Sequence, residues 1–227
     1  MGGQACVLYG AAEFSRDIDL ALLADPENLA RLRAAMIELD ASPIAVPPLS
    51  LEYLVRGHAA HFRCAAPWAA GIRVDLMSVL RGVGPFKELW ERRTTLAIGT
   101  DEVDLLSLPD LVRAKKTQRD KDWPMIRRLV EADYFAHRDD MTSARVSFWL
   151  AELRSPSLLV ELVALHPSEA ALVSRPAVTA ASRSDVAAVE RELALEQAAE
   201  VAADREYWAP LKRELESLRR SRPRDVR

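Results

Sequence analysis

Two aspartates separated by one apolar residue, Asp17-Ile18-Asp19, constrain the fold more than any other part of the sequence. Side chains two positions apart on a β-strand point to the same face, so the two carboxylates are expected to project together while Ile18 enters the core. Two carboxylates on one short strand suit a hard divalent cation that is shared with substrate phosphates. The alternative is an edge strand whose aspartates simply face solvent.

A pair of glycines, Gly2-Gly3, stands shortly before this motif. Glycine lets the backbone approach a triphosphate closely at the start of a helix, which makes the pair a candidate nucleotide-binding turn. The other interpretation is a flexible chain terminus. Ser15, just before the aspartates, either donates its hydroxyl to a phosphate oxygen or caps the turn into the strand.

A third carboxylate, Asp75, lies in a later apolar segment. Residues 61–65 and 71–78 are expected to form neighbouring strands, and this pairing would bring Asp75 beside the first two aspartates. Three clustered carboxylates repel one another, so their proximity favours a bound metal ion. The alternative for Asp75 is an ion pair with the neighbouring Arg73.

A basic segment contains Lys115 and Lys116, on a helix that is expected to run from residue 107 to about residue 121. On such a helix Lys115, Arg119 and Asp122 share a face. This face is either a polar stripe directed at a site, with the lysines neutralising a triphosphate, or a solvated face with internal ion pairs. Asp122 has a further interpretation, as the N-cap of a new helix.

Together these residues resemble the nucleotidyltransferase superfamily, whose motif is a Gly-Gly or Gly-Ser turn followed by Asp-x-Asp and a distant third carboxylate. More narrowly, they resemble the AbiEii-type branch, the nucleotidyltransferase-like toxins of bacterial abortive-infection and toxin–antitoxin systems. The resemblance covers residues 2–135. The residues that match are Gly2, Gly3, Ser15, Asp17 and Asp19, with Asp75 as the third carboxylate and Lys115 and Lys116 in the basic helix.

The resemblance implies an α/β (α+β) fold, with a mixed sheet and flanking helices in residues 1–135. In this superfamily a strand precedes the glycine pair, whereas only Met1 precedes it here. We therefore expect a sheet without its usual first strand, or a chain shortened from a longer protein. Residues 141–227 are expected to form a helical C-terminal region, with a linker at residues 174–184 and separate helices at 185–204 and 205–220.

The activity that the resemblance implies is Mg²⁺-dependent transfer of a nucleoside monophosphate from an NTP to an acceptor. Asp17 and Asp19 would hold a Mg²⁺ ion that bridges the triphosphate, and Asp75 a second ion that activates the acceptor hydroxyl. The acceptor would be RNA, in particular tRNA, in a toxin-like or phage-defence protein with a cognate antitoxin protein as partner. The alternatives are a small-molecule acceptor, or a non-catalytic or truncated protein of this fold that binds nucleotide or a partner protein.

The chain has 227 residues, of which 49% are hydrophobic, and its composition limits the partners and the compartment that are expected for it. The net charge of −3 gives no general attraction for nucleic acid, so RNA binding would need a local basic patch. The closing arginines either contact RNA phosphates or form a solvated tail; they are Arg219, Arg220, Arg222, Arg224 and Arg227.

Two cysteines are too few for a disulfide framework and fit a reducing compartment. No apolar run reaches the length of a membrane span, and no signal peptide opens the chain. We therefore expect a cytoplasmic protein that is not associated with a membrane.

Overall fold

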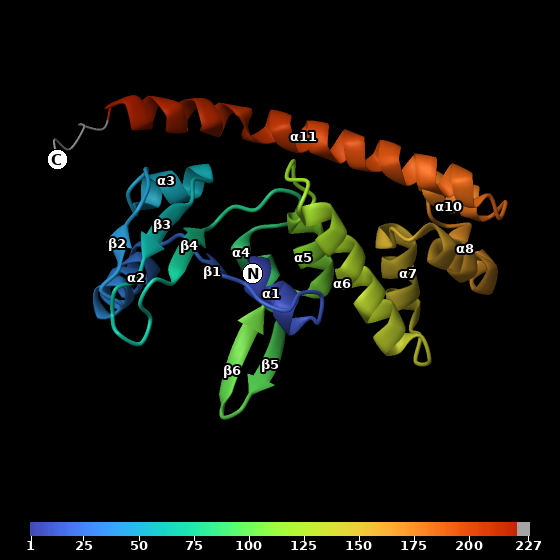
Figure 1. The fold of residues 1–227 in the computed structure, drawn as a ribbon, viewed down its shortest axis with the longest axis horizontal. Helices are drawn as coiled ribbons and strands as arrows, with labels where there is room; N and C mark the ends of the chain where they lie inside the picture. The colour runs from blue at the N-terminus through green and yellow to red at the C-terminus, as the bar shows by residue number, and fades with distance from the viewer. Residues whose placement is uncertain (222–227) are drawn as a thin grey trace. The chain divides into compact units, whose positions relative to one another are not determined.

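The structure is a computed structural model that describes residues 1–221, a mixed α+β fold (Figure 1). The predicted fold class is confirmed: helices flank a mixed sheet, and the C-terminal part of the chain is helical. The chain forms two compact units. The first unit contains residues 1–8, residues 12–114 and the segment from Glu206 onward, and the second contains residues 9–11 and 115–205. The predicted domains, 1–135 and 141–227, have other boundaries and stay a prediction.

The main sheet of the first unit has four strands in the order β1-β4-β3-β2. Its strands are β1 (Asp17–Ala21), β2 (Ser42–Pro43), β3 (Ala60–Arg63) and β4 (Arg73–Met77). β1 lies at one edge and runs parallel to β4, while β3 is antiparallel to both of its neighbours. The strands predicted at residues 61–65 and 71–78 are therefore confirmed as neighbours.

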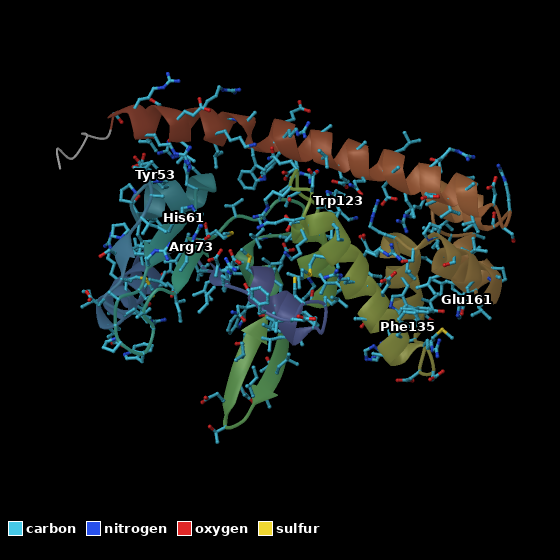
Figure 2. All side chains as sticks on the ribbon, in the orientation of Figure 1. Tyr53, His61, Arg73, Trp123, Phe135 and Glu161 are labelled. Atoms are coloured by element: carbon cyan, nitrogen blue, oxygen red, sulfur yellow. The ribbon has the colours of Figure 1, made fainter. Side chains whose placement is uncertain are left out.

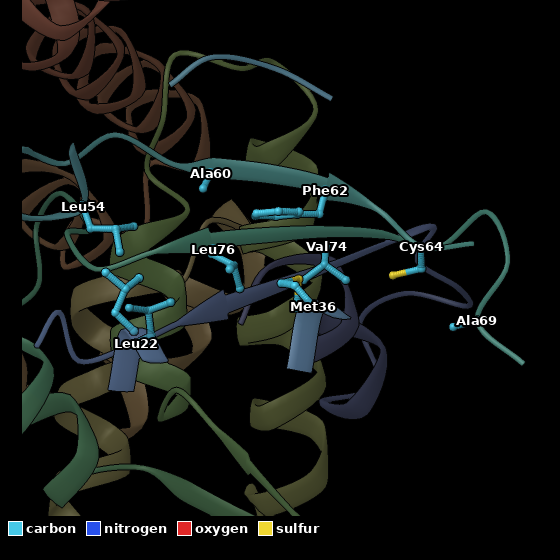
Figure 3. Close-up of a cluster of buried hydrophobic side chains, with 10 residues drawn as sticks. Leu22, Met36, Leu54, Ala60, Phe62, Cys64, Ala69, Val74 and Leu76 are labelled. Atoms are coloured by element: carbon cyan, nitrogen blue, oxygen red, sulfur yellow. The ribbon is translucent and has the colours of Figure 1, made fainter. Parts of the chain in front are cut away.

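One face of this sheet is apolar and is covered by α2 (Pro26–Glu38) and α3 (Leu51–Arg56). Figure 3 shows the cluster that they form together. The buried members are Leu22, Leu29, Met36, Leu54, Ala60, Phe62, Cys64, Ala69, Val74 and Leu76. The strand residues in this cluster alternate with polar ones, as the period of a half-buried strand requires. The opposite face of the sheet is consequently the polar one.

The remaining elements of the first unit before residue 114 are short. They are α1 (Gly2–Leu8), α4 (Phe86–Glu91), the hairpin of β5 (Thr94–Ile98) and β6 (Asp101–Leu105), and α5 (Leu108–Ala114). The predicted start of α5 is confirmed, because the Ser107 hydroxyl donates to Asp110 and accepts a hydrogen bond from the Asp110 amide. The predicted end near residue 121 is wrong, since α5 ends at Ala114.

The second unit is helical. Its elements are α6 (Asp122–His137), α7 (Ser143–Glu152), α8 (Pro156–Leu165), α9 (Pro167–Ala170), α10 (Pro176–Ala181) and the first part of α11 (Val186–Ser221). The linker predicted at residues 174–184 is wrong, because most of it is α10. Pro176 occupies the first turn of that helix, where a missing amide hydrogen costs nothing, and α10 buries both Ala177 and Val178.

Residues 186–221 form one continuous helix, α11, so the prediction of two helices is wrong. Pro210 lies inside this helix and does not end it. The last part of α11 belongs to the first unit, where Glu214 accepts a hydrogen bond from His58 at 2.9 Å and pairs with Arg56 at 2.6 Å.

Two further predictions concern RNA and a membrane as possible partners. Arg222, Arg224 and Arg227 lie outside the described residues, so the interpretation of the closing arginines stays a prediction. Across residues 1–221, none of the helices combines the length and the apolar character that crossing a membrane requires.

Candidate active site on the polar face of the sheet

The strand register collects the predicted carboxylates on one face of the sheet. In the register of β1 and β4, Asp17 lies opposite Arg73 and Asp19 lies opposite Asp75. In the register of β4 and β3, Asp75 lies opposite His61. Partners in register point to the same side, which here is the side opposite the apolar core. We call this surface the polar face; it consists of Asp17, Asp19, His61, Arg63, Arg73 and Asp75. The expected approach of Asp75 to the two earlier aspartates is therefore confirmed.

Both carboxylate oxygens of Asp75 are already engaged. Arg73 donates from Nε to Oδ1 and from Nη2 to Oδ2, each at 2.8 Å, so the arginine binds the carboxylate in a bidentate manner. Nδ1 of His61 lies 2.8 Å from Oδ1. Figure 2 labels His61 and Arg73 on their neighbouring strands. The ion pair with Arg73, one of the two interpretations of Asp75, is thus present.

Arg73 offsets part of the negative charge on the polar face. Burial alone raises the pKa of Asp75, but the hydrogen bonds from His61 and Arg73 outweigh it and hold this pKa below its ordinary value. The hydrogen bond to Asp75, together with the negative charges of Asp75, Asp17 and Asp19, raises the pKa of the Arg73 guanidinium despite its partial burial. All three aspartates therefore act on the same cation.

The lowered pKa of Asp75 predicts how stability depends on pH. A carboxyl group with a depressed folded pKa stabilises the protein above its unfolded pKa, about 3.9 for aspartate, and this stabilisation is lost as the pH falls toward the folded value. The Asp75→Asn variant is therefore expected to show a shallower loss of unfolding free energy than the wild type below about pH 4. Urea unfolding from pH 7 to pH 3 measures this. Asp101→Asn, at an exposed position in the same unit, should keep the wild-type slope, and an equal slope for Asp75→Asn would contradict the assignment.

The two glycines bring α1 against Asp19. Gly2 has φ +68°, and a Cβ atom there would lie 1.9 Å from Oδ2 of Asp19, so a side chain is sterically impossible without movement. The Gly3 amide donates to the same oxygen at 3.4 Å, and the Met1 amino group donates to the Asp19 carbonyl at 2.8 Å. α1 spans residues 2–8, so the glycines are part of its first turn.

Ser15 is placed in the turn before β1. Its hydroxyl donates to the backbone carbonyl of Asp17 at 3.0 Å, which is the local capping role. A Cβ atom on Gly3 would lie 2.3 Å from this hydroxyl oxygen, so the turn also depends on glycine at position 3. A contact between Ser15 and a phosphate stays a prediction.

Lys115 and Lys116 belong to the second unit, and each faces a carboxylate there. Nζ of Lys115 lies 3.5 Å from Oδ1 of Asp122, and Nζ of Lys116 lies 2.7 Å from Oε2 of Glu152. Neither lysine is helical, because both follow the end of α5. The alternative of internal ion pairs thus describes their contacts, and phosphate binding by either lysine stays a prediction.

Asp122 organises the loop between α5 and α6. It is buried and accepts hydrogen bonds from Thr117 at 2.6 Å and from Arg119 at 2.8 Å. A new helix does begin here, as one interpretation predicted. The Asp122 side chain lies in its first turn and does not cap it, since its oxygens are used by the preceding loop.

The donor chemistry of the polar face fits one divalent cation better than two. Asp17 and Asp19 supply carboxylate oxygens, and Mg²⁺ is commonly held by one or two carboxylates, with phosphate and water oxygens completing its shell. Asp75 offers no free oxygen while Arg73 is bound to it. Residues 1–221 contain no group of three or more His, Cys, Asp or Glu side chains arranged to hold a metal ion.

The sequence motifs do not single out His61, whose Nδ1 lies 2.8 Å from Oδ1 of Asp75. Its signal was available in the alternation of residues 60–63, which places His61 on the same face as Arg63 and opposite Phe62.

No family model matches the chain, and no curated protein or solved structure matches it either. The residues of the polar face and the resemblance of their sequence motifs are therefore what indicates a function.

Proposed function

We propose that this protein is a Mg²⁺-dependent nucleotidyltransferase that moves a nucleoside monophosphate from an NTP to an acceptor hydroxyl, with RNA as the acceptor. One observation carries the proposal: Asp19 lies in register with Asp75 across two parallel strands, and Asp17 lies on the same face of β1. The glycine turn of α1 packs directly on the Asp19 carboxylate, which is where the resemblance expects the triphosphate.

The proposed reaction on the polar face is an in-line displacement at phosphorus. The acceptor oxygen forms a new bond to the α-phosphorus, the bond to the α,β-bridging oxygen breaks, pyrophosphate leaves with the bonding electrons, and the acceptor proton passes to solvent. Asp17 and Asp19 would hold a Mg²⁺ ion, which would supply positive charge to the triphosphate oxygens. Arg73 adds a fixed positive charge beside the same aspartates, and His61 and Arg73 hold Asp75 in one orientation.

A transfer assay tests the proposal. Purified protein is incubated with total tRNA, Mg²⁺ and each α-labelled NTP in turn, and the label on RNA is measured. Label that depends on protein and disappears when EDTA replaces Mg²⁺ supports the proposal and identifies the preferred base. A parallel reaction with small hydroxylated acceptors in place of RNA tests the acceptor class. Absence of label from all reactions with folded protein contradicts a nucleotidyltransferase.

The ion pair of Asp75 with Arg73 favours a second candidate, a non-catalytic protein of the same kind that binds nucleotide or a partner protein. In that case the ion pair between Asp75 and Arg73 stabilises the fold and is retained when nucleotide binds. This candidate predicts Mg²⁺-dependent NTP binding in equilibrium dialysis with no release of pyrophosphate. Detection of pyrophosphate would reject it.

A toxin-like or phage-defence role, with tRNA as target and a cognate antitoxin as partner, is part of the proposal and is supported by the resemblance alone. Growth arrest on expression, relieved by a mutation that removes Asp17, is its direct test.

A further inference from the structure

A shallow apolar hollow lies beside β1 in the first unit. Leu20 and Ala21, which follow Asp19 directly on that strand, form one side of it. Leu89, Trp90 and Leu105 form much of the rest. Because a strand rises about 3.3 Å per residue, the wall of the hollow begins about one residue step from the Asp19 backbone.

Two aromatic side chains of α4 line this hollow. Phe86 and Trp90 are four residues apart on the helix, their rings are stacked with centroids 5.9 Å apart, and Trp90 keeps 44% of its surface exposed. The same pair also lines a second hollow together with Arg31 and Lys87. Phe86 is half-buried, so Trp90 is the ring of the pair that is exposed to a ligand at the wall of the hollow.

A cation lies over the Trp90 ring. The Arg93 guanidinium lies 4.1 Å from the centroid of the Trp90 ring and is held there by Asp104, whose Oδ1 accepts from Arg93 Nε at 3.0 Å and from Thr95 at 2.6 Å. Planar rings flanked by a guanidinium and a carboxylate suit a flat, polar-edged heterocycle, which stacks on the rings and bonds through its edge.

We propose that the hollow lined by Leu20, Phe86, Trp90 and Arg93 binds the base of a nucleoside triphosphate whose phosphates lie at Asp17 and Asp19. The inference rests on the proposed function, because the phosphates are placed at the predicted metal ligands. It assigns a separate task to α4, whose residues contribute nothing to the polar face.

Two probes separate the base from the phosphates: the four NTPs, and inorganic tripolyphosphate, which has no base. Binding of each is measured calorimetrically with Mg²⁺ present. Trp90→Ala is expected to weaken NTP binding about 5- to 150-fold, the range that loss of one base–aromatic stack gives, and to leave tripolyphosphate binding unchanged. Trp90→Phe keeps a ring and should keep most of the affinity. Trp68→Ala is the matched control, since Trp68 is exposed in the same unit and lies outside the hollow.

The binding of the two probes to the variants distinguishes the base site from the phosphate site. NTP binding that survives Trp90→Ala, or a variant that loses NTP and tripolyphosphate equally, overturns the base site. The Asp17→Asn variant reports on the phosphate end and should weaken both probes. If Asp17→Asn binds both probes normally while Trp90→Ala selectively loses NTPs, the base site stands and the proposed function fails. If the wild type binds no NTP, both fail. Circular dichroism and thermal unfolding confirm that each variant is folded.

Discussion

Replacing Asp17 with alanine is expected to lower the rate of nucleotidyl transfer by about 10³-fold or more, with little change in the free energy of unfolding. Metal-assisted charge stabilisation in such reactions contributes several kcal/mol to the transition state, and about 4 kcal/mol corresponds to about 10³ in rate. Asp17 is half-buried at the edge strand, and its register partner is Arg73. Its removal takes one carboxylate from the polar face and leaves the apolar core untouched.

The measurement compares initial rates of label transfer at saturating NTP and Mg²⁺, with urea unfolding of both proteins alongside. Asp101→Ala is the control, because Asp101 is an exposed aspartate of the same unit at the start of β6. It should retain the wild-type rate. A folded Asp17→Ala protein that keeps more than a tenth of the wild-type rate would show that the site has been assigned to the wrong residues.

Replacing Glu196 with alanine is expected to destabilise the second unit by about 3–5 kcal/mol, the usual cost of leaving buried charges without their partner. Glu196 of α11 pairs with Arg154 at 3.3 Å and with Arg175 at 3.0 Å. Both arginines are more than 90% buried and also donate to backbone carbonyls, Arg154 to Leu193 and Arg175 to Leu150. Burial already lowers the pKa of Arg154, and Glu196 opposes that effect.

Hydrogen–deuterium exchange gives the local measurement for this variant, since the amides of α7, α10 and the first half of α11 should exchange faster. Urea unfolding gives the free energy. Glu190→Ala, at an exposed position on the same helix, should lie within about 0.5 kcal/mol of the wild type. Glu196→Gln, which keeps the hydrogen-bond acceptor, should be less destabilised than the alanine variant. Equal stability of Glu196→Ala and wild type would mean that the two arginines are adequately solvated without it.

Sequence reasoning succeeded where the signal is local. The start of α2 follows from Asp25 and Pro26, and Asp25 does accept a hydrogen bond from the Asn28 amide at 2.8 Å. Strands β1, β3 and β4 of the main sheet follow from apolar residues at alternate positions, which also distinguish the polar face from the core, whereas the two-residue strand β2 has no such signal. Because that alternation fixes which side each residue points to, the grouping of Asp17, Asp19 and Asp75 could be predicted.

It failed where distant residues decide the conformation. The segment after Ala114 has helical composition, yet the Gln118 amide donates to Asp204, 86 residues further along the chain, at 2.9 Å, and this contact favours a loop. Pro176 resembles a linker signal, but it starts a helix whose alanines are buried. At the site, the strand prediction allowed both a metal and Arg73 as the partner of Asp75. Only the side-chain geometry shows that the arginine is bound there.

The first unit is discontinuous, since its residues up to Ala114 are joined by the segment from Glu206 onward. Contacts such as those of His58 and Arg56 with Glu214 close this unit across more than 150 residues of chain. At roughly 5–20 residues per second, a ribosome needs roughly 5–20 s to pass from position 114 to position 206. During that interval the nascent sheet lacks the last part of α11 while the helices of the second unit are synthesised. Because residues 115–205 are synthesised before the segment from Glu206, the second unit can finish folding before the first unit does.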